Sequence, residues 1–564
     1  MDAYPDWPNL ATMMFSRARQ WPDRPMLRAF AGGAWHGLTW SQFARRAASA
    51  ARRLRAAGIS AGDRVLIVAE NRPDYPIIET ALMAIRAVPV PTYTTNTVED
   101  HRHIITDCGA RAAIVSTAAL ALKVAAAAPL DLLIAMEDFS ATGIQTAQWR
   151  DFIAEDADWA DIEAEAALIP RTALACLIYT SGTGGAPKGV MLPHRAILSN
   201  CRGAYILTLP LNFHHETYLS FLPLSHSYEH TAGQFFFLSI GSEIVYSRGV
   251  EHLAADMVAI RPTILTMVPR VLEVIRGRIQ GQLAREKPWK RWLFERAIAA
   301  GLARAERRRR GLVDLLLEPA YENLVRRKVR GRFGGRLRAA VSGGARLDPA
   351  IGRFYLGLGM LLLQGYGQTE AGPVISANPP QDCRIDTVGP PLEGVHLRIA
   401  EDGEILVAGD LVMDGYWGRP DETAHAISDG WLHTGDIGEL DADGYLRITD
   451  RKKDMIVLSG GENVSPARIE GMLVAEPAII QAIVLGEGKS GLTALLVAAE
   501  GHDDSSVQAA LSDVNKRLSV TERIRRHAVV PAFTLENGLL TATQKIKRHL
   551  VRQAHAGLLE KLGA

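Results

Sequence analysis

The chain is poor in the features that mark disulfide-rich, zinc-binding and strongly charged proteins. Its 564 residues include four cysteines, Cys108, Cys176, Cys201 and Cys383, which lie far apart and form no Cys-x-x-Cys pair. This spacing predicts reduced thiols and excludes a disulfide framework or zinc site of the usual spacing. The net charge is only +1, so the composition predicts no nucleic-acid partner.

The chain also lacks the signals of secretion and of membrane insertion. Residues 1–6 contain no basic n-region and no apolar h-region, so we expect no signal peptide. The most apolar long stretch, about 112–136, is interrupted by Lys123, Pro129 and Asp131. It predicts a buried strand, helix and strand rather than a membrane span. We therefore expect a cytoplasmic protein.

What is present is the composition of a large globular enzyme. Hydrophobic residues make up 48% and charged residues 22% of the chain, and a chain of this length is too long for one core. A helix is predicted at 76–88. Strands are predicted at 64–69, 90–93, 112–115, 174–179, 218–222, 243–246 and 264–268. This alternation predicts an α/β fold with two doubly wound subdomains, each a parallel sheet with helices on both faces.

The C-terminal third of the chain has a different pattern. Short strands are predicted at 395–399, 404–407 and 445–448, with Gly and Pro closely spaced between 386 and 448, which indicates a small antiparallel β unit. After the charged run at 450–454, strands at 482–485 and 493–498 and a helix at 506–519 predict an α+β domain with its own core. We therefore expect an N-terminal domain at 1–449 and a C-terminal domain at 450–564.

The segment 179–190 combines hydroxyl residues, glycines, Pro187 and a closing lysine. Glycines let main-chain N–H groups approach an anion closely, and hydroxyl and ammonium groups add donors. The candidate phosphate-binding residues are Thr180, Ser181, Gly182, Thr183 and Lys188. The order of residues fits neither a Walker loop nor a dinucleotide fingerprint. A nucleotide-handling enzyme of a third class is the favoured interpretation, with a flexible surface loop as the alternative.

Further candidate residues follow other predicted strands. The small residues Gly343, Gly344 and Ala345 would let a flat ring lie against the main chain. The segment 364–370, after a strand predicted at 360–363, includes Gly365, Tyr366, Gly367, Thr369 and Glu370. In a parallel sheet ligands bind at the carboxyl ends of strands. Tyr366 is therefore a candidate to stack a base, Thr369 to contact phosphate, and Glu370 to hold Mg²⁺, which prefers oxygen ligands. The alternative for Glu370 is a solvated carboxylate.

Three candidates lie in segments with weaker signals. Asp436, predicted at a turn, offers a carboxylate that suits a ribose diol. His226 follows a predicted strand and is either structural or catalytic. Residues 459–466 place Gly460, Gly461 and Glu462 before a helix start at Ser465 and Pro466, a favourable capping pair.

Taken together, these segments resemble the superfamily of adenylate-forming enzymes, which includes acyl- and aryl-CoA synthetases, luciferases and peptide-synthetase adenylation domains. The resemblance runs from about residue 40 to residue 548. Five motifs occur in the family's order and spacing: the phosphate loop, residues 365–370, 433–436 and 450–451, and Lys545. One departure is Gly184, where the phosphate loop often has a second Thr or Ser. Within the superfamily, the chain is most similar to long-chain fatty acyl-CoA synthetases. The clues are the segments 222–229, 365–370 and 460–463 and the basic helical insert, residues 271–332.

The resemblance implies an acid–thiol ligase that uses ATP, Mg²⁺ and coenzyme A. A fatty acid would be converted to an acyl-adenylate and then to acyl-CoA. It implies that Lys545 bridges the acid and the α-phosphate, that Arg451 contacts ribose or phosphate, and that Asp450 is a hinge for a mobile C-terminal domain. Residues 460–462 would then lie on the coenzyme A side, and His226 and Thr369 are catalytic candidates. Without the resemblance, Lys545 would be interpreted as a solvated lysine.

The sequence leaves several functions open. The acid could be medium-chain or aromatic, the thiol could belong to a carrier protein, or the chain could be a non-catalytic nucleotide-binding scaffold. The Arg-rich segment 271–332 is either a solvated helical hairpin or a basic surface that contacts the inner face of a membrane.

Overall fold

The structure is a computed structural model. It describes residues 4–141, 143–155, 158–180, 186–452, 454–460, 462–534, 536–540 and 546–563. The chain folds into two compact units. Among the described residues, unit 1 holds those of Met1–Gly182, Ala186–Leu397 and Val407–Leu432, and unit 2 holds those of Arg398–Leu406 and His433–Ala564.

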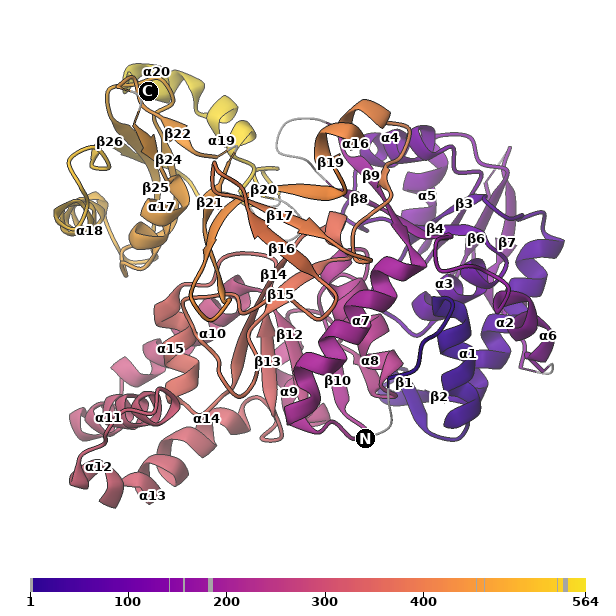
Figure 1. Cartoon of the computed structure of the whole chain (residues 1–564), viewed down its shortest axis with the longest axis horizontal. Coiled ribbons are helices and arrows are strands. Elements are labelled where there is room, and N and C mark those ends of the chain that lie inside the picture. The colour runs from indigo at the N-terminus through magenta and orange to yellow at the C-terminus, as the bar shows by residue number, and fades with distance from the viewer. Residues whose placement is uncertain are drawn as a thin grey trace. The chain divides into compact units, whose positions relative to one another are not determined.

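Unit 1 contains two large, mainly parallel sheets (Figure 1). The larger has the order β15-β14-β13-β12-β10-β11-β1-β2, and the second, all parallel, has the order β4-β3-β5-β6-β7. The strands of the first are β1 Pro25–Ala31, β2 Ala34–Thr39, β10 Thr217–Ser220, β11 Glu243–Tyr246, β12 Ile264–Met267, β13 Ala339–Ser342, β14 Leu362–Gly367 and β15 Val374–Ala377. Those of the second are β3 Arg64–Val68, β4 Val88–Pro91, β5 Ala112–Val115, β6 Leu132–Ala135 and β7 Gln145–Gln148. The predicted α/β fold with two layers is confirmed.

Helices of unit 1 connect and cover these sheets. Capping boxes begin two of them: Thr39 accepts from the main chain of Gln42, and Thr97 from that of Asp100, which satisfies N–H groups that a helix start leaves unpaired. The helices are α1 Leu10–Gln20, α2 Trp40–Ala56, α3 Asp74–Ala84, α4 Val98–Cys108, α5 Ala118–Ala127, η1 Trp149–Phe152, α6 Ala160–Ala166, α7 His194–Thr208, η2 Leu209–Leu211, the π-helix η3 Glu229–Phe235, α8 Phe236–Ser239, α9 Leu253–Ile260, α15 Pro349–Gly357, η5 Thr369–Ala371 and α16 Pro420–Ala426.

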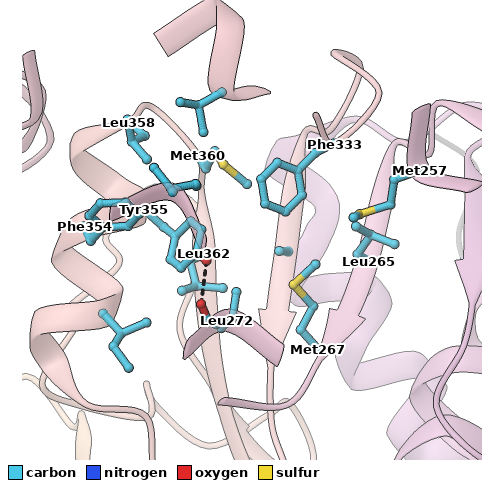
Figure 2. Close-up of a cluster of buried hydrophobic side chains, with 14 of the residues drawn as sticks. Met257, Leu265, Met267, Leu272, Phe333, Phe354, Tyr355, Leu358, Met360 and Leu362 are labelled. Carbon is cyan, nitrogen blue, oxygen red and sulfur yellow. Dashed lines mark hydrogen bonds between the residues drawn. The ribbon is translucent and has the colours of Figure 1, made fainter. Parts of the chain in front are cut away.

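The predicted helical segment 271–332 is also confirmed. It contains α10 Pro269–Ala284, α11 Pro288–Ala305, α12 Leu312–Leu316, α13 Glu318–Ala320, the π-helix η4 Tyr321–Arg326 and α14 Arg327–Gly331. Its inner side joins a hydrophobic core with the sheet strands, in which Met267, Phe333, Tyr355 and Leu362 pack together (Figure 2). Tyr355 donates a hydrogen bond of 2.7 Å to the carbonyl of Leu272, which ties α15 to α10.

Three local predictions need correction. The strand predicted at 174–179 exists as β8 Leu174–Thr180 but is not part of a parallel sheet: it pairs antiparallel with β9 Lys188–Pro193, and β18 Gly415–Tyr416 joins them. A connection of seven residues is too short for a parallel crossover. The strand predicted at 360–363 continues to Gly367, because residues 365–367 pair with β15. Asp436 lies in strand β20 Trp431–Leu440 rather than at a turn, opposite Arg451.

The short strands predicted between 386 and 448 form a five-stranded sheet: β16 His396–Ile399, β17 Glu404–Ala408, β19 Ile427–Ser428, β20 and β21 Leu446–Arg451. The residues after this sheet, all in unit 2, form the hairpin β22 Ile456–Val457 and β23 Asn463–Val464, the sheet β24 Ile479–Leu485, β25 Leu492–Ala498 and β26 Ile524–Val529, and helices α17 Pro466–Val474, α18 Asp504–Lys516, α19 Arg548–Ala554 and α20 Ala556–Lys561. Two hydrophobic clusters within 456–559 give this part its own core.

Among the described residues, the structure contains no helix with both the length and the apolar composition of a membrane span.

Candidate active site

The two ends of the predicted phosphate loop face each other across a β-hairpin. Thr180, at the end of β8, pairs with Lys188, at the start of β9, and Tyr179 pairs with Gly189. A Cβ atom at Gly189 would come within 3.0 Å of the Tyr179 ring, so glycine permits this close crossing. The predicted residues Ser181, Gly182 and Thr183, and also Gly184, lie outside the described residues.

Lys188 contacts two side chains from residues 416–422. Its ammonium forms an ion pair with the Glu422 carboxylate and lies 4.9 Å from the centre of the Tyr416 ring. Both contacts hold a positive charge at the mouth of the hairpin, and the aromatic face attracts that charge electrostatically. Lys188 therefore presents a cation at the start of β9, and its phosphate-binding role stays a prediction.

Tyr416 connects this lysine to the predicted metal-binding carboxylate. Its hydroxyl donates a hydrogen bond of 2.9 Å to Oε1 of Glu370, a half-buried side chain. Burial, and then the Glu370 charge, raise the pKa of Tyr416 well above its ordinary value, so the hydroxyl stays protonated and remains a donor. Spacing could not have revealed this contact, because the two residues are 46 positions apart.

Thr369, adjacent to Glu370, is held by the segment that carries His226. Its hydroxyl lies 2.9 Å from the hydroxyl of Ser227, and both side chains are buried. His226 is half-buried at the turn before the π-helix η3, where its Nδ1 accepts from the Tyr228 main chain at 3.1 Å. The structure thus gives His226 a local structural contact, and its catalytic role stays a prediction.

Tyr228 packs against the predicted ring-binding glycines. A Cβ atom at Gly343 would lie 2.9 Å from the Tyr228 ring, and the Tyr228 hydroxyl donates to the carbonyl of Val341 at 2.9 Å. Gly344 has φ +79°, a left-handed conformation that glycine adopts without strain. Residues 343–345 follow β13, and residues 364–370 form the end of the neighbouring parallel strand β14 and the residues directly after it. The predicted base-binding groups therefore lie at the ends of adjacent strands of one sheet.

A fully buried polar network surrounds Glu229, the residue that follows Tyr228. The sequence analysis did not predict this network. The Glu229 carboxylate accepts hydrogen bonds from Tyr218, Ser220 and Thr266 at 2.7–2.8 Å. Burial raises the pKa of Glu229 from 4.5 to about 7. Gly233, one turn further on, leaves the space that the carboxylate fills, because a Cβ atom there would lie 2.4 Å from the Glu229 carboxyl carbon. The network fixes the start of η3. Ser227, which contacts Thr369, and Tyr228, which contacts Gly343, directly precede this helix.

Unit 2 carries the remaining predicted residues. Asp436, which is 3% exposed, accepts a 2.9 Å hydrogen bond from Nε of Arg451. Asp450 is buried, and its Oδ1 accepts from the main chain of Arg451 at 2.6 Å. Gly460 lies against the Glu462 carboxylate, where a Cβ atom would come within 2.5 Å, and Ser465 caps α17 as predicted. Gly461 and Lys545 lie outside the described residues.

The donor set around Glu370 fits Mg²⁺ that is carried with a nucleotide. In the described part of the chain, no three His, Cys, Asp or Glu side chains cluster as a metal cage. A single carboxylate near the predicted phosphate-binding lysine, Lys188, suits an ion that keeps several waters and takes its other ligands from substrate phosphates.

The sequence comparisons define the class of protein. Residues 14–417 match the family of AMP-binding enzymes, and residues 453–562 match the AMP-binding enzyme C-terminal domain. The chain belongs to the AMP-binding enzyme family and is a ligase of the adenylate-forming superfamily.

Individual relatives are similar to this chain over most of its length. The chain is 34% identical over 583 residues to the long-chain-fatty-acid–CoA ligase FadD15 of Mycobacterium tuberculosis, covering 98% of this chain and 97% of the relative. It is 32% identical over 476 residues to long chain acyl-CoA synthetase 1 of Arabidopsis thaliana, covering 79% and 71%. Among solved structures, the anthranilate CoA ligase AuaEII with anthranoyl-AMP has a TM-score of 0.77 at 20% identity, with 99% of each chain covered. This last likeness concerns the fold.

Proposed function

We propose that the chain converts a long-chain fatty acid to its acyl-CoA with ATP and coenzyme A. In the first step the fatty-acid carboxylate oxygen attacks the α-phosphorus of ATP, and the bond to pyrophosphate breaks. In the second, the sulfur of coenzyme A attacks the acyl carbon, the thiol loses its proton, and AMP leaves. The similarity to long-chain-fatty-acid–CoA ligases over 98% of the chain is the observation that carries this proposal.

Unit 1 supplies the triphosphate site in this proposal. The hairpin residues 180–188 hold the β- and γ-phosphates. Lys188 supplies positive charge, and Thr369 supplies a hydroxyl donor. Residues 343–345 and 365–367, with Tyr366, hold the adenine. The first step brings two anions together, so its catalysis depends on positioning and on compensating charge. Mg²⁺ held by Glu370 would neutralise phosphate charge when bound.

Unit 2 supplies the groups that distinguish the two steps. We assign Asp436 to the ribose diol and Arg451 to ribose or phosphate. Lys545 is assigned to the bridge between the acid and the α-phosphate. The boundary between the N-terminal and C-terminal domains is assigned to residue 450, and Asp450 is the hinge. Rotation about this hinge withdraws Lys545 after the first step and brings residues 460–462 toward the coenzyme A path. His226 stays a catalytic candidate without an assigned step.

A panel of acids tests the substrate class. The full chain is incubated with ATP, Mg²⁺ and coenzyme A, and AMP release is scored with palmitate, octanoate and benzoate. Palmitate is expected to give the highest kcat/KM. A higher value with octanoate or benzoate would replace the proposal with a medium-chain or aryl-CoA ligase.

Changing the thiol acceptor in the same assay tests the second step. Without coenzyme A, pyrophosphate exchange should persist while steady turnover stops. Turnover with a carrier-protein thiol in place of coenzyme A would indicate an acyl-AMP ligase that loads a carrier. Failure to release pyrophosphate with any acid would indicate a nucleotide-binding scaffold.

A further inference from the structure

The helical segment 271–332 carries an unusual share of the chain's positive charge. It contains seventeen Lys and Arg against seven Asp and Glu, a net charge of +10, so the rest of the chain carries −9. Some of these charges are internally paired, as in Arg326 with Glu318 and Arg330 with Glu322. The segment is nevertheless a strongly basic part of an almost neutral protein.

The same segment exposes apolar side chains that would ordinarily be buried. Of the sixteen exposed large hydrophobic residues in the described part of the chain, eight lie here. They are Val274, Trp289, Trp292, Leu312, Val313, Leu315, Leu316 and Leu324, with Leu312 and Leu316 each 80% exposed. Single exposed apolar residues are normal, but a concentration of them marks an interaction surface.

Six of these residues come from two helices that are tied together. The Arg296 guanidinium of α11 lies 2.5 Å from the Asp314 carboxylate of α12, and Tyr321 donates to the same carboxylate at 3.1 Å. Trp292 lies one helical turn before Arg296, and Trp289 a further turn back. Figure 1 shows α11, α12 and α13 together at one end of unit 1. We name this surface the Trp–Leu patch: Trp289, Trp292, Leu312, Val313, Leu315 and Leu316.

The patch is not a displaced piece of the core. On α11, Phe294, Ala297 and Gly301 are buried and anchor the helix to unit 1. None of the residues of α12 is buried. The buried side chains of α11 thus pack into the core of unit 1. The side chains of the patch are separate from them and are not part of that core.

Exposed basic residues flank the patch on both sides. Lys287, Lys290 and Arg291 surround the two tryptophans in sequence, and Arg307–Arg309 are exposed just before α12. Trp and Leu side chains bordered by Lys and Arg match the chemistry of a membrane interface, where aromatic rings sit at headgroup level and cations meet anionic lipids. Basic residues near such a surface add electrostatic attraction to the anionic lipids.

We propose that the Trp–Leu patch docks the enzyme on an anionic lipid surface, with Trp289, Trp292, Leu312 and Leu316 entering the headgroup region. The inference does not depend on which acid is the substrate. A protein partner is the other candidate occupant. The patch is small and apolar and has exposed basic residues around it, which favours an anionic lipid surface over a protein partner. Attraction between these basic residues and anionic lipids does not require a partner of matching shape.

Vesicle binding of the full chain tests this proposal. Vesicles of phosphatidylcholine alone and of phosphatidylcholine with about 30% phosphatidylglycerol are sedimented with the wild type, with Trp289→Ala/Trp292→Ala and with Leu312→Ser/Leu316→Ser. The wild type should bind the anionic vesicles, and each double variant should bind at least about tenfold more weakly. Binding should fall as salt rises from about 0.1 to about 1 M, since the screening length shrinks from about 10 to about 3 Å.

The matched control is Leu168→Ser/Val250→Ser, which removes two similarly exposed apolar side chains elsewhere in unit 1 and should bind like the wild type. Brominated lipids should quench tryptophan fluorescence in the wild type and not in Trp289→Ala/Trp292→Ala. Thermal melting and AMP release with octanoate check that all variants are folded. The proposal is overturned if the wild type fails to bind, binds neutral and anionic vesicles equally, or binds no better than the patch variants.

Discussion

Tyr416 joins the predicted phosphate lysine to the predicted metal carboxylate. Its hydroxyl donates to Oε1 of Glu370 at 2.9 Å, and the Lys188 ammonium lies 4.9 Å from the centre of its ring. The three residues come from three separate stretches of the chain, and the β8–β9–β18 sheet brings Lys188 and Tyr416 together. One phenol thus orients the anion and the cation that the proposed triphosphate site needs.

Tyr416→Phe should weaken the response to Mg²⁺. The substitution keeps the ring beside Lys188 and removes only the donor that orients Glu370. A hydrogen bond to a charged group is worth about 1.5–3 kcal/mol, so the Mg²⁺ concentration for half-maximal pyrophosphate exchange should rise about tenfold or more. Tyr321→Phe, which removes a donor to Asp314 in the helical insert, is the matched control. An unchanged Mg²⁺ dependence in Tyr416→Phe would remove the orienting role.

The candidate residues could be predicted from the sequence, but their supporting contacts could not. Thr369 and Glu370 stand in a recognisable short motif, whereas Ser227 and Tyr416 reach them from 142 and 46 positions away. Local patterns carry no information about such distant partners. The antiparallel pairing of β8 was missed for a related reason, since strand periodicity alone does not distinguish parallel from antiparallel neighbours.

Ser227→Ala and Thr369→Val should act non-additively on ATP use. The two hydroxyls lie 2.9 Å apart and are buried, so removal of the Ser227 hydroxyl leaves Thr369 without its orienting partner. Ser227→Ala should lower kcat/KM for ATP about fivefold, in line with about 1 kcal/mol for a neutral hydrogen bond, and Thr369→Val should lower it further. The double variant should equal Thr369→Val alone. Additive losses would show that the two residues act separately.

Glu422→Gln should improve ATP binding. Glu422 forms an ion pair with Lys188, and phosphate must compete with that carboxylate for the ammonium. Because both partners are about a third exposed, the pair contributes at most about 1 kcal/mol, and KM for ATP should fall about two- to fivefold. Glu393→Gln, which breaks the exposed pair with Arg202, should leave KM unchanged. A higher KM in Glu422→Gln would mean that Glu422 positions Lys188 rather than competes for it.

Glu229 should make stability fall as pH rises. Burial raises its pKa from 4.5 to about 7, so in this window the folded chain binds a proton that the unfolded chain has lost. Its favourable contribution is full below pH 4.5 and is lost as pH rises through about 7. Between about pH 5 and about pH 8, the free energy of unfolding should therefore fall by about 2.5 kcal/mol. Glutamine resembles the protonated carboxyl, so Glu229→Gln should lack this loss.

The measurement for Glu229 is the urea midpoint of unfolding at about pH 5 and about pH 8. The difference between the two pH values should be larger in the wild type than in Glu229→Gln. Glu243→Gln, at a partly exposed pair with Arg28, controls for general removal of a carboxylate. An identical pH response in the wild type and Glu229→Gln would exclude a buried Glu229 that titrates near neutrality.

Lys545→Ala should separate the two chemical steps. If Lys545 bridges the acid and the α-phosphate only during adenylation, its loss should abolish pyrophosphate exchange, because the substitution removes the positive charge that this role places between the two anions. Thioester formation from supplied acyl-adenylate should be largely retained. Lys547→Ala, two residues further along the same basic run, should leave both steps intact. An equal loss of both steps in Lys545→Ala would contradict its assignment and would point to a role in holding unit 2 together.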